Sequence, residues 1–130
     1  MTGECTNQYY SQTSICIHVK GSSVNETASN SEVTKAIKYT TGATVNTYGK
    51  VPFSMFKFRI DNKKPVVFKM SWNSGGAHAL VVAGYNAVYE KLRVVDPAVG
   101  KGIVWYYYED LCEGTTIQSG TGEYTYTWAI

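Results

Sequence analysis

Apolar and polar residues alternate along the second half of the chain. From Pro65 onward, short runs rich in Val, Tyr and Trp are separated by glycines and polar turns. This period of two is typical of strands in a sheet that buries one face. The predicted strands are PVVFKMSW (65–72), HALVVAGY (78–85), KLRVVD (91–96), GIVWYYY (102–108) and EYTYTWAI (123–130). Their order predicts a twisted antiparallel sheet.

The first half of the chain carries helical spacing instead. Ser29 and Glu32 form a capping-box pattern ahead of apolar residues at helical intervals, which predicts a helix over residues 31–39. Apolar side chains at i, i+3 and i+7 predict a second helix over residues 53–60, which ends before a polar turn.

A weaker pattern precedes these two helices. Residues 2–10 (TGECTNQYY) predict a short helix, and residues 14–20 predict an extended segment. Helices followed by a β-meander make an α+β domain with segregated elements. Because the chain has 130 residues and no linker, we expect one domain over residues 1–130.

Composition and charge exclude several classes of protein. Hydrophobic residues make up 44% and charged residues 17% of the sequence, which is unlike a disordered tail. The net charge of +2 comes from scattered basic residues, so nucleic acid is not an expected partner. No apolar run approaches the roughly 20 residues of a membrane span, and the chain does not begin like a signal peptide. We therefore expect the chain as given to be soluble.

The cysteines do not predict a metal site. Cys5, Cys16 and Cys112 form neither a CxxC pair nor a Cys/His cluster of zinc spacing, so no structural metal and no cofactor are expected. An odd count leaves at least one free thiol. Their spacing leaves open whether Cys5 and Cys16 form a disulfide.

One histidine and one aspartate stand at the ends of neighbouring predicted strands. The strand 78–85 begins at His78, and the strand 91–96 ends at Asp96. If they pair through a loop centred on Ala87, His78 faces Asp96 directly, with Cβ atoms about 4.5 to 5.5 Å apart. The same register pairs Tyr85 with Tyr89, Val82 with Leu92 and Leu80 with Val94.

This pair has two interpretations. A carboxylate on one imidazole nitrogen fixes the tautomer and prepares the other nitrogen to take a proton from a nucleophile, which is half of a catalytic triad. Alternatively, His78 and Asp96 form a structural pair that closes the open end of the hairpin. Gly75 and Gly76 favour the catalytic interpretation, because residues without side chains let a substrate backbone approach the imidazole.

The order of these motifs resembles a known family. The segments KKPVVFKMSWNSGGAHALVVAGYN and LRVVDPAVGKGIVWYYYEDL resemble the C-terminal half of bacterial papain-like cysteine peptidases, the double-glycine leader-peptidase type with its secreted and effector relatives. The resemblance implies a papain-like α+β fold, a peptide or protein substrate, and export or association with a membrane transporter. It also implies that His78 is the general base and Asp96 the residue that orients it.

The nucleophile of that family is a cysteine at the start of the first helix, which typically opens with Cys-Trp-Ala and closes with Tyr-Tyr. Tyr9–Tyr10 resembles the closing pair, and an alignment on it places the expected cysteine a few residues before Met1. Cys5 would lie about two turns, roughly 10 Å, into the helix and is expected to fill the core. Cys16 and Cys112 are weaker candidates still.

We therefore expect this chain to hold the His and Asp of a Cys-His-Asp peptidase without its thiol, and to be inert by itself. The alternative is a catalytically inactive papain-like module that binds a peptide or leader sequence without cutting it. A structural or adhesive secreted β-domain would account for the many Tyr and Thr residues, but it leaves the ordered motifs unexplained.

Overall fold

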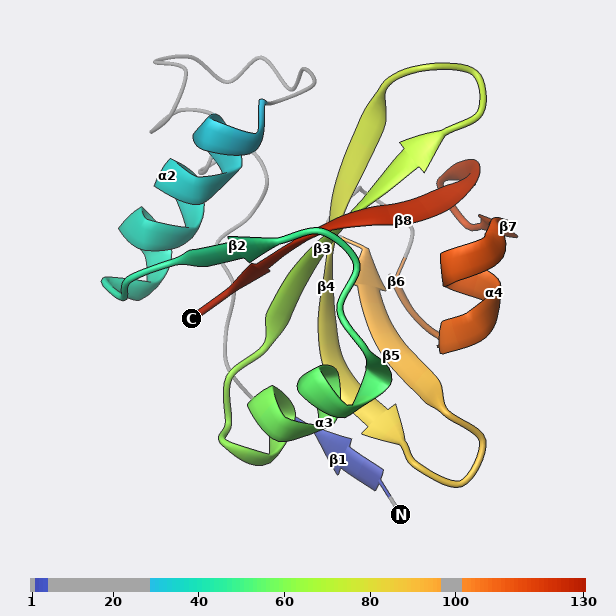
Figure 1. Ribbon diagram of the computed structural model, residues 1–130, viewed down its shortest axis with the longest axis horizontal. Coiled ribbons are helices and arrows are strands. Elements are labelled where there is room, and N and C mark those ends of the chain that lie inside the picture. The colour runs from blue at the N-terminus through green and yellow to red at the C-terminus, as the bar shows by residue number, and fades with distance from the viewer. Residues whose placement is uncertain (1, 5–28, 97–101) are drawn as a thin grey trace.

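The computed structural model describes residues 2–4, 29–96 and 102–130. The helices are α2 (Asn30–Thr41), α3 (Phe53–Asp61) and α4 (Tyr108–Glu113), and the strands are β1 (Thr2–Glu4), β2 (Asn46–Tyr48), β3 (Val66–Trp72), β4 (Ala77–Asn86), β5 (Lys91–Asp96), β6 (Gly102–Tyr107), β7 (Thr115–Ile117) and β8 (Gly120–Ala129). All five predicted strands are present. In the described part of the chain they belong to one antiparallel sheet of eight strands, whose main path runs β2-β8-β3-β4-β5-β6 (Figure 1).

The two longer helices form where the sequence predicted them. Ser29 caps α2: its Oγ accepts from the Glu32 amide at 3.2 Å, and the Glu32 carboxylate accepts from the Ser29 amide at 3.0 Å. Gly42 ends α2 in the left-handed conformation, with φ of 68°, which a glycine adopts at little cost. Of the three apolar residues that predicted α3, Phe56 and Ile60 are buried and Phe53 is partly buried against the core.

The start of the chain differs from the prediction. Thr2–Glu4 form strand β1, which pairs antiparallel with β4 from Gly84 to Asn86, so the helix predicted over residues 2–10 is wrong at residues 2–4. The exposed backbone edge of β4 at this point supplies hydrogen-bond partners that outweigh the weak helical preference of Thr and Gly. The rest of that predicted helix and the extended segment 14–20 lie outside the described residues.

The core lies on the face of the sheet that α3 and α4 cover. Alternate residues of the central strands point into it, among them Phe68, Met70, Leu80 and Val94, and they meet Phe56 of α3. Rings pack edge to face across this layer: the Phe56 and Tyr124 centroids are 5.8 Å apart, and those of Phe68 and Tyr124 are 5.7 Å apart.

Helix α2 lies at one end of the other face, beside β2 and the end of β8 (Figure 1). Trp128 points to this face, opposite to its neighbour Thr127, and its Nε1 donates to the Asn30 carbonyl at 3.3 Å and to Thr34 Oγ1 at 3.1 Å. Among the helices of the described residues, none is long and apolar enough to cross a membrane.

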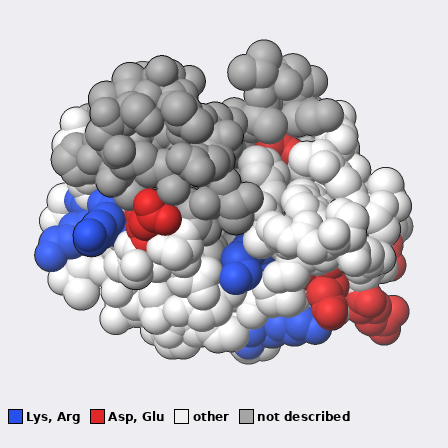
Figure 2. All heavy atoms as spheres, turned by 90° about the horizontal axis from the view of Figure 1, so that it is seen from above, with Lys and Arg blue, Asp and Glu red and all other residues white. Residues whose placement is uncertain are grey.

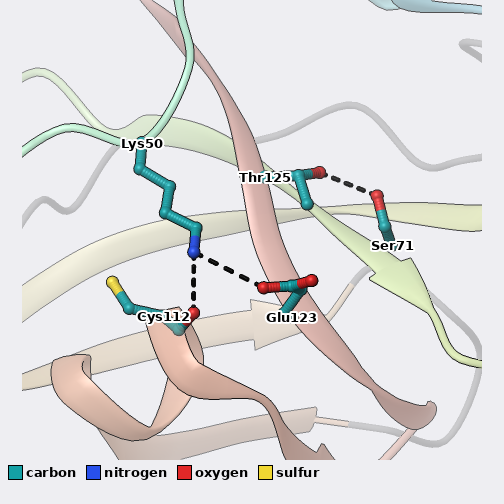
Figure 3. Close-up of polar contacts among 5 residues, drawn as sticks. All are labelled: Lys50, Ser71, Cys112, Glu123 and Thr125. Atoms are coloured by element: carbon teal, nitrogen blue, oxygen red, sulfur yellow. Dashed lines mark hydrogen bonds and ion pairs between the residues drawn. The ribbon is translucent and has the colours of Figure 1, made fainter.

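A bulge bends the strand pair β3–β8. The register shifts between Lys69 and Met70, which leaves Thr125 of β8 as the extra residue. Its hydroxyl lies 2.7 Å from that of Ser71, so the bulge is joined to β3 by a side-chain hydrogen bond (Figure 3). This feature lies at the end of the sheet that carries His78.

Candidate functional site

The structure brings His78 and Asp96 into direct contact. His78 lies near the start of β4 and Asp96 at the end of β5, and His78 Nε2 is 2.7 Å from Asp96 Oδ1. Their side chains are only 15% and 5% exposed. A carboxylate can only accept, so Nε2 donates and the ring is held as one tautomer. The predicted hydrogen bond is therefore present, and it leaves Nδ1 as the nitrogen that can take a proton.

The register that makes this contact is not the predicted one. Val82 pairs with Val94, and not with Leu92 as predicted. Continuing that ladder sets Leu80 opposite Asp96, with His78 two residues further along β4. Such diagonal neighbours have Cα atoms about 7 to 8 Å apart, and the long imidazole side chain spans the gap. An error of two residues preserves the face, which is why the contact survived it.

The turn between β4 and β5 accounts for the difference. Asn86 pairs with Lys91, so the loop has its centre beyond Ala87, and Tyr85 pairs with Leu92 rather than Tyr89. The Asn86 side chain stabilises this loop, because its Oδ1 accepts from the amides of Val88 at 3.0 Å and Tyr89 at 3.2 Å.

A bulge at Ala83 then decides whether His78 and Asp96 lie on the same face of the sheet. Gly84 pairs with Arg93 and Val82 with Val94, so Ala83 is an extra residue on β4. A regular ladder continued from the Gly84 pair would set Asp96 opposite Val81 and leave His78 on the other face of the sheet. The bulge corrects this parity, and it lies where β4 changes its other neighbour from β3 to β1.

Asp96 lines a small cavity whose other described lining residues are mostly apolar. They include Leu80, Val94, Ile117 and Tyr106, beside the polar Gln118. A hydrogen bond that involves an ionised group is stronger when water is kept away from it. This environment therefore favours a well-formed bond to His78.

The turn before His78 contains the two glycines that the sequence singled out. Gly75 and Gly76 have φ values of 98° and 80°, a conformation that residues with a Cβ rarely adopt. No atom of the described residues lies within 4 Å of a Cβ built on either glycine. The glycines thus shape a tight turn with open space beside it.

Sequence reasoning missed one neighbour of the histidine. The indole of Trp72, the last residue of β3, stacks on the imidazole, with ring centroids 6.2 Å apart and planes 24° apart. The sequence did contain a signal for this contact. Only four residues separate the strand that ends at Trp72 from the strand that begins beside His78, and paired strands joined by a short link bring such ends together.

Cys112 lies in different surroundings. It sits on α4, and its carbonyl accepts from Lys50 Nζ at 2.8 Å, while Lys50 also reaches Glu123 at 3.4 Å (Figure 3). The side chain of Tyr108 lies next to Cys112. Burial is the largest cause of the raised pKa of Tyr108, and a side-chain hydrogen bond to Cys112 is the next largest. Asp96 and Trp72, which contact His78, are not among these neighbours of Cys112. Cys5 and Cys16 lie outside the described residues.

Charged side chains and potential metal ligands were compared over the described residues. On the face shown in Figure 2, basic and acidic side chains are interspersed rather than gathered into one charged field. Among the described residues there is no cluster of three or more His, Cys, Asp or Glu side chains that could hold a metal ion.

Helices α2 and α3 precede the main strands of an antiparallel sheet, an arrangement that fits an α+β papain-like fold. The chain belongs to the Peptidase_C39 like family, which it matches over residues 2–120. Its function is therefore related to that of papain-like cysteine peptidases. No curated protein matches the chain.

Proposed function

We propose that His78 and Asp96 are the general base and the orienting residue of a Cys-His-Asp site that hydrolyses peptide bonds. The observation that carries the proposal is the 2.7 Å bond from His78 Nε2 to Asp96 Oδ1, in a place from which most water is excluded. A His–Asp pair with a purely structural role would need this hydrogen bond but no room for a substrate. The turn of Gly75 and Gly76 shortly before His78 also supports the proposal, because no described atom lies within 4 Å of a Cβ built on either glycine and a substrate backbone could approach there.

The chemistry follows from which ring nitrogen is occupied. With Nε2–H held by Asp96, Nδ1 accepts the thiol proton as sulfur bonds to the carbonyl carbon of the scissile peptide. The imidazolium then gives that proton to the leaving amine as the C–N bond breaks. Water next attacks the thioester with Nδ1 as base, which releases a carboxylic acid and restores the thiol. Asp96 stays ionised throughout and stabilises the imidazolium.

We further propose that none of the three cysteines of this sequence is the nucleophile. The family resemblance calls for Cys followed by Trp, and neither Cys5, Cys16 nor Cys112 precedes a tryptophan. Cys112 has other neighbours, as described above. Because residues 2–4 form a strand, the helical alignment on Tyr9–Tyr10 no longer locates the thiol. The missing Cys-Trp pair supports a nucleophile outside these 130 residues.

Labelling by a thiol-directed electrophilic peptide, mapped by mass spectrometry, tests this proposal. The 130-residue chain and a chain extended by the upstream in-frame codons are compared, each with and without a triple Cys-to-Ser substitution at the three known cysteines. We expect rapid labelling of the extended chain only, unchanged by the triple substitution. Rapid labelling of the 130-residue chain that one of these substitutions abolishes would contradict the outside nucleophile.

A second candidate is a papain-like module that binds a peptide or leader without cleaving it. The absence of a Cys-Trp pair from the sequence favours it as much as it favours an outside thiol. Upstream codons without an in-frame cysteine, together with saturable binding of peptides by the 130-residue chain, would decide for the binding module.

A further inference from the structure

Trp72 lies between the His78 imidazole and the start of β8. Its indole stacks on the His78 imidazole, and the ring also lies against the backbone of Gly120 at the start of β8. A Cβ built on Gly120 would lie 3.2 Å from two indole carbons and 3.3 Å from a third. Only a residue without a side chain leaves the ring where it is, so the position of the indole depends on glycine at this point of β8.

The backbone of Trp72 is fixed on both sides. Its amide donates to the Gly76 carbonyl at 3.0 Å, and its carbonyl accepts from the Gly75 amide at 3.0 Å. On the other side Trp72 pairs with Gly122 of β8, where a Cβ would lie 2.9 Å from the Trp72 Cα. The indole is therefore attached to a rigid frame.

The imidazole of His78 could rotate about its second side-chain torsion if no neighbouring ring restricted it. The second side-chain torsion of histidine is broad and roughly two-fold, so the backbone of β4 alone does not aim Nε2 at Asp96. A stacked aromatic ring restricts this torsion and covers one side of the ring against water. The 15% exposure of the His78 side chain is consistent with such cover.

We propose that Trp72 is a positioning residue that holds the His78 imidazole with Nε2 toward Asp96 and shields that hydrogen bond from water. The inference rests on the proposed role of His78 as general base, which it deepens by naming what keeps the base in its working orientation. A merely structural Trp72 would stabilise the fold without a specific effect on the imidazole.

Hydrogen exchange of the His78 Nε2–H, followed by NMR on the 130-residue chain, separates the two roles. The variants are Trp72→Leu, which removes the stack, and Trp72→Phe, which keeps an aromatic ring. Trp105→Leu is the matched control, because Trp105 lies on β6 and points to the face away from the core. The backbone amide of Val82 serves as the internal reference for opening of the whole sheet.

We expect Nε2–H to exchange at least about tenfold faster in Trp72→Leu than in the parent chain, relative to the Val82 amide. Trp72→Phe should restore the rate to within about threefold, and Trp105→Leu should leave it unchanged. Should Trp72→Leu fold poorly, Gly120→Ala displaces the same ring by a few tenths of an ångström, and Gly49→Ala, with no described atom within 4 Å of its new Cβ, is its control. Gly120→Ala should then accelerate Nε2–H exchange and Gly49→Ala should not.

Equal acceleration at Nε2–H and at the Val82 amide would overturn the positioning role, since it would report lost stability alone. Asp96→Ala shows which proposal has failed. If Asp96→Ala removes the protection of Nε2–H and Trp72→Leu does not, the inference about Trp72 is wrong while the His78–Asp96 pair stands. If Nε2–H is unprotected in the parent chain, both proposals are wrong.

Discussion

A double-mutant cycle on His78 and Asp96 measures how strongly the two side chains are coupled in the folded state. The single variants are His78→Ala and Asp96→Ala, and the third is the double variant. Removing one partner leaves the other buried without its bond, because the two side chains are only 15% and 5% exposed. In the double variant both side chains are gone, so neither one is left buried without its partner. The coupling therefore isolates the bond from other effects of each substitution.

The expected coupling is about 1.5 to 3 kcal/mol, the range for a hydrogen bond to a charged group in surroundings that exclude water. A surface pair in the same protein gives the scale for comparison. Lys50 and Glu123 are 3.4 Å apart, with side chains 43% and 51% exposed, and such pairs contribute at most about 1 kcal/mol (Figure 3). Burial, rather than the formal charges, should separate the two couplings.

Urea unfolding at pH 7.5, followed by circular dichroism, gives the free energy of unfolding of each variant. The cycle on Lys50 and Glu123, also with alanine, is run under the same conditions. A His78–Asp96 coupling no larger than that of the surface pair would refute the reasoning, because it would mean that the bond is not formed or not shielded in solution.

Other predictions concern the frame around the site. Gly122→Ala should lower the free energy of unfolding by at least about 3 kcal/mol, since its Cβ would lie 2.1 Å from a carbonyl oxygen of β3. Gly49→Ala, whose Cβ meets no described atom within 4 Å, should change it by less than about 0.5 kcal/mol. Equal losses of stability in urea unfolding would contradict the packing argument. Ser29→Ala should cost about 1 kcal/mol by removing the cap of α2, and an unchanged urea midpoint would show that the cap contributes nothing. Burial raises the pKa of Tyr108 and of Tyr124 above 10, so the stability that these neutral phenols provide is complete below pH 10 and is lost as pH rises further. Melting temperatures measured from pH 8 to 11 should fall above pH 10, and a flat profile would contradict this.

Most of the sheet could be predicted from the sequence, because its strands alternate regularly and end at glycine or polar turns. The helices α2 and α3 carry explicit start signals or helical spacing. Strand β1 could not be predicted in the same way, since Thr2–Glu4 are fixed by pairing with β4, a contact between residues far apart in the chain. Helix α4 has six residues, too few to show a period.

The candidate site was predictable in its members and not in its register. A period of two puts His78 and Asp96 on one face for any register that is wrong by an even number of residues. The actual register depends on the Asn86 side chain in the turn and on the extra residue at Ala83. An asparagine after an apolar strand is compatible with more than one loop length, and the extra residue at Ala83 is decided by how β4 fits its neighbouring strands. Trp72 was missed although the short link between β3 and β4 was a signal, because a period of two does not show which side chains at paired strand ends stack.

The central claim is that His78 acts as the general base toward a thiol that is none of the three cysteines of this sequence. Its most direct measurement is kcat/KM for peptide hydrolysis by the chain extended with its upstream codons and carrying the triple Cys-to-Ser substitution. We predict that His78→Ala lowers kcat/KM at least about 100-fold, while His18→Ala, at the other histidine, changes it less than about twofold. Activity that survives His78→Ala, or that disappears with the triple substitution, would contradict the account.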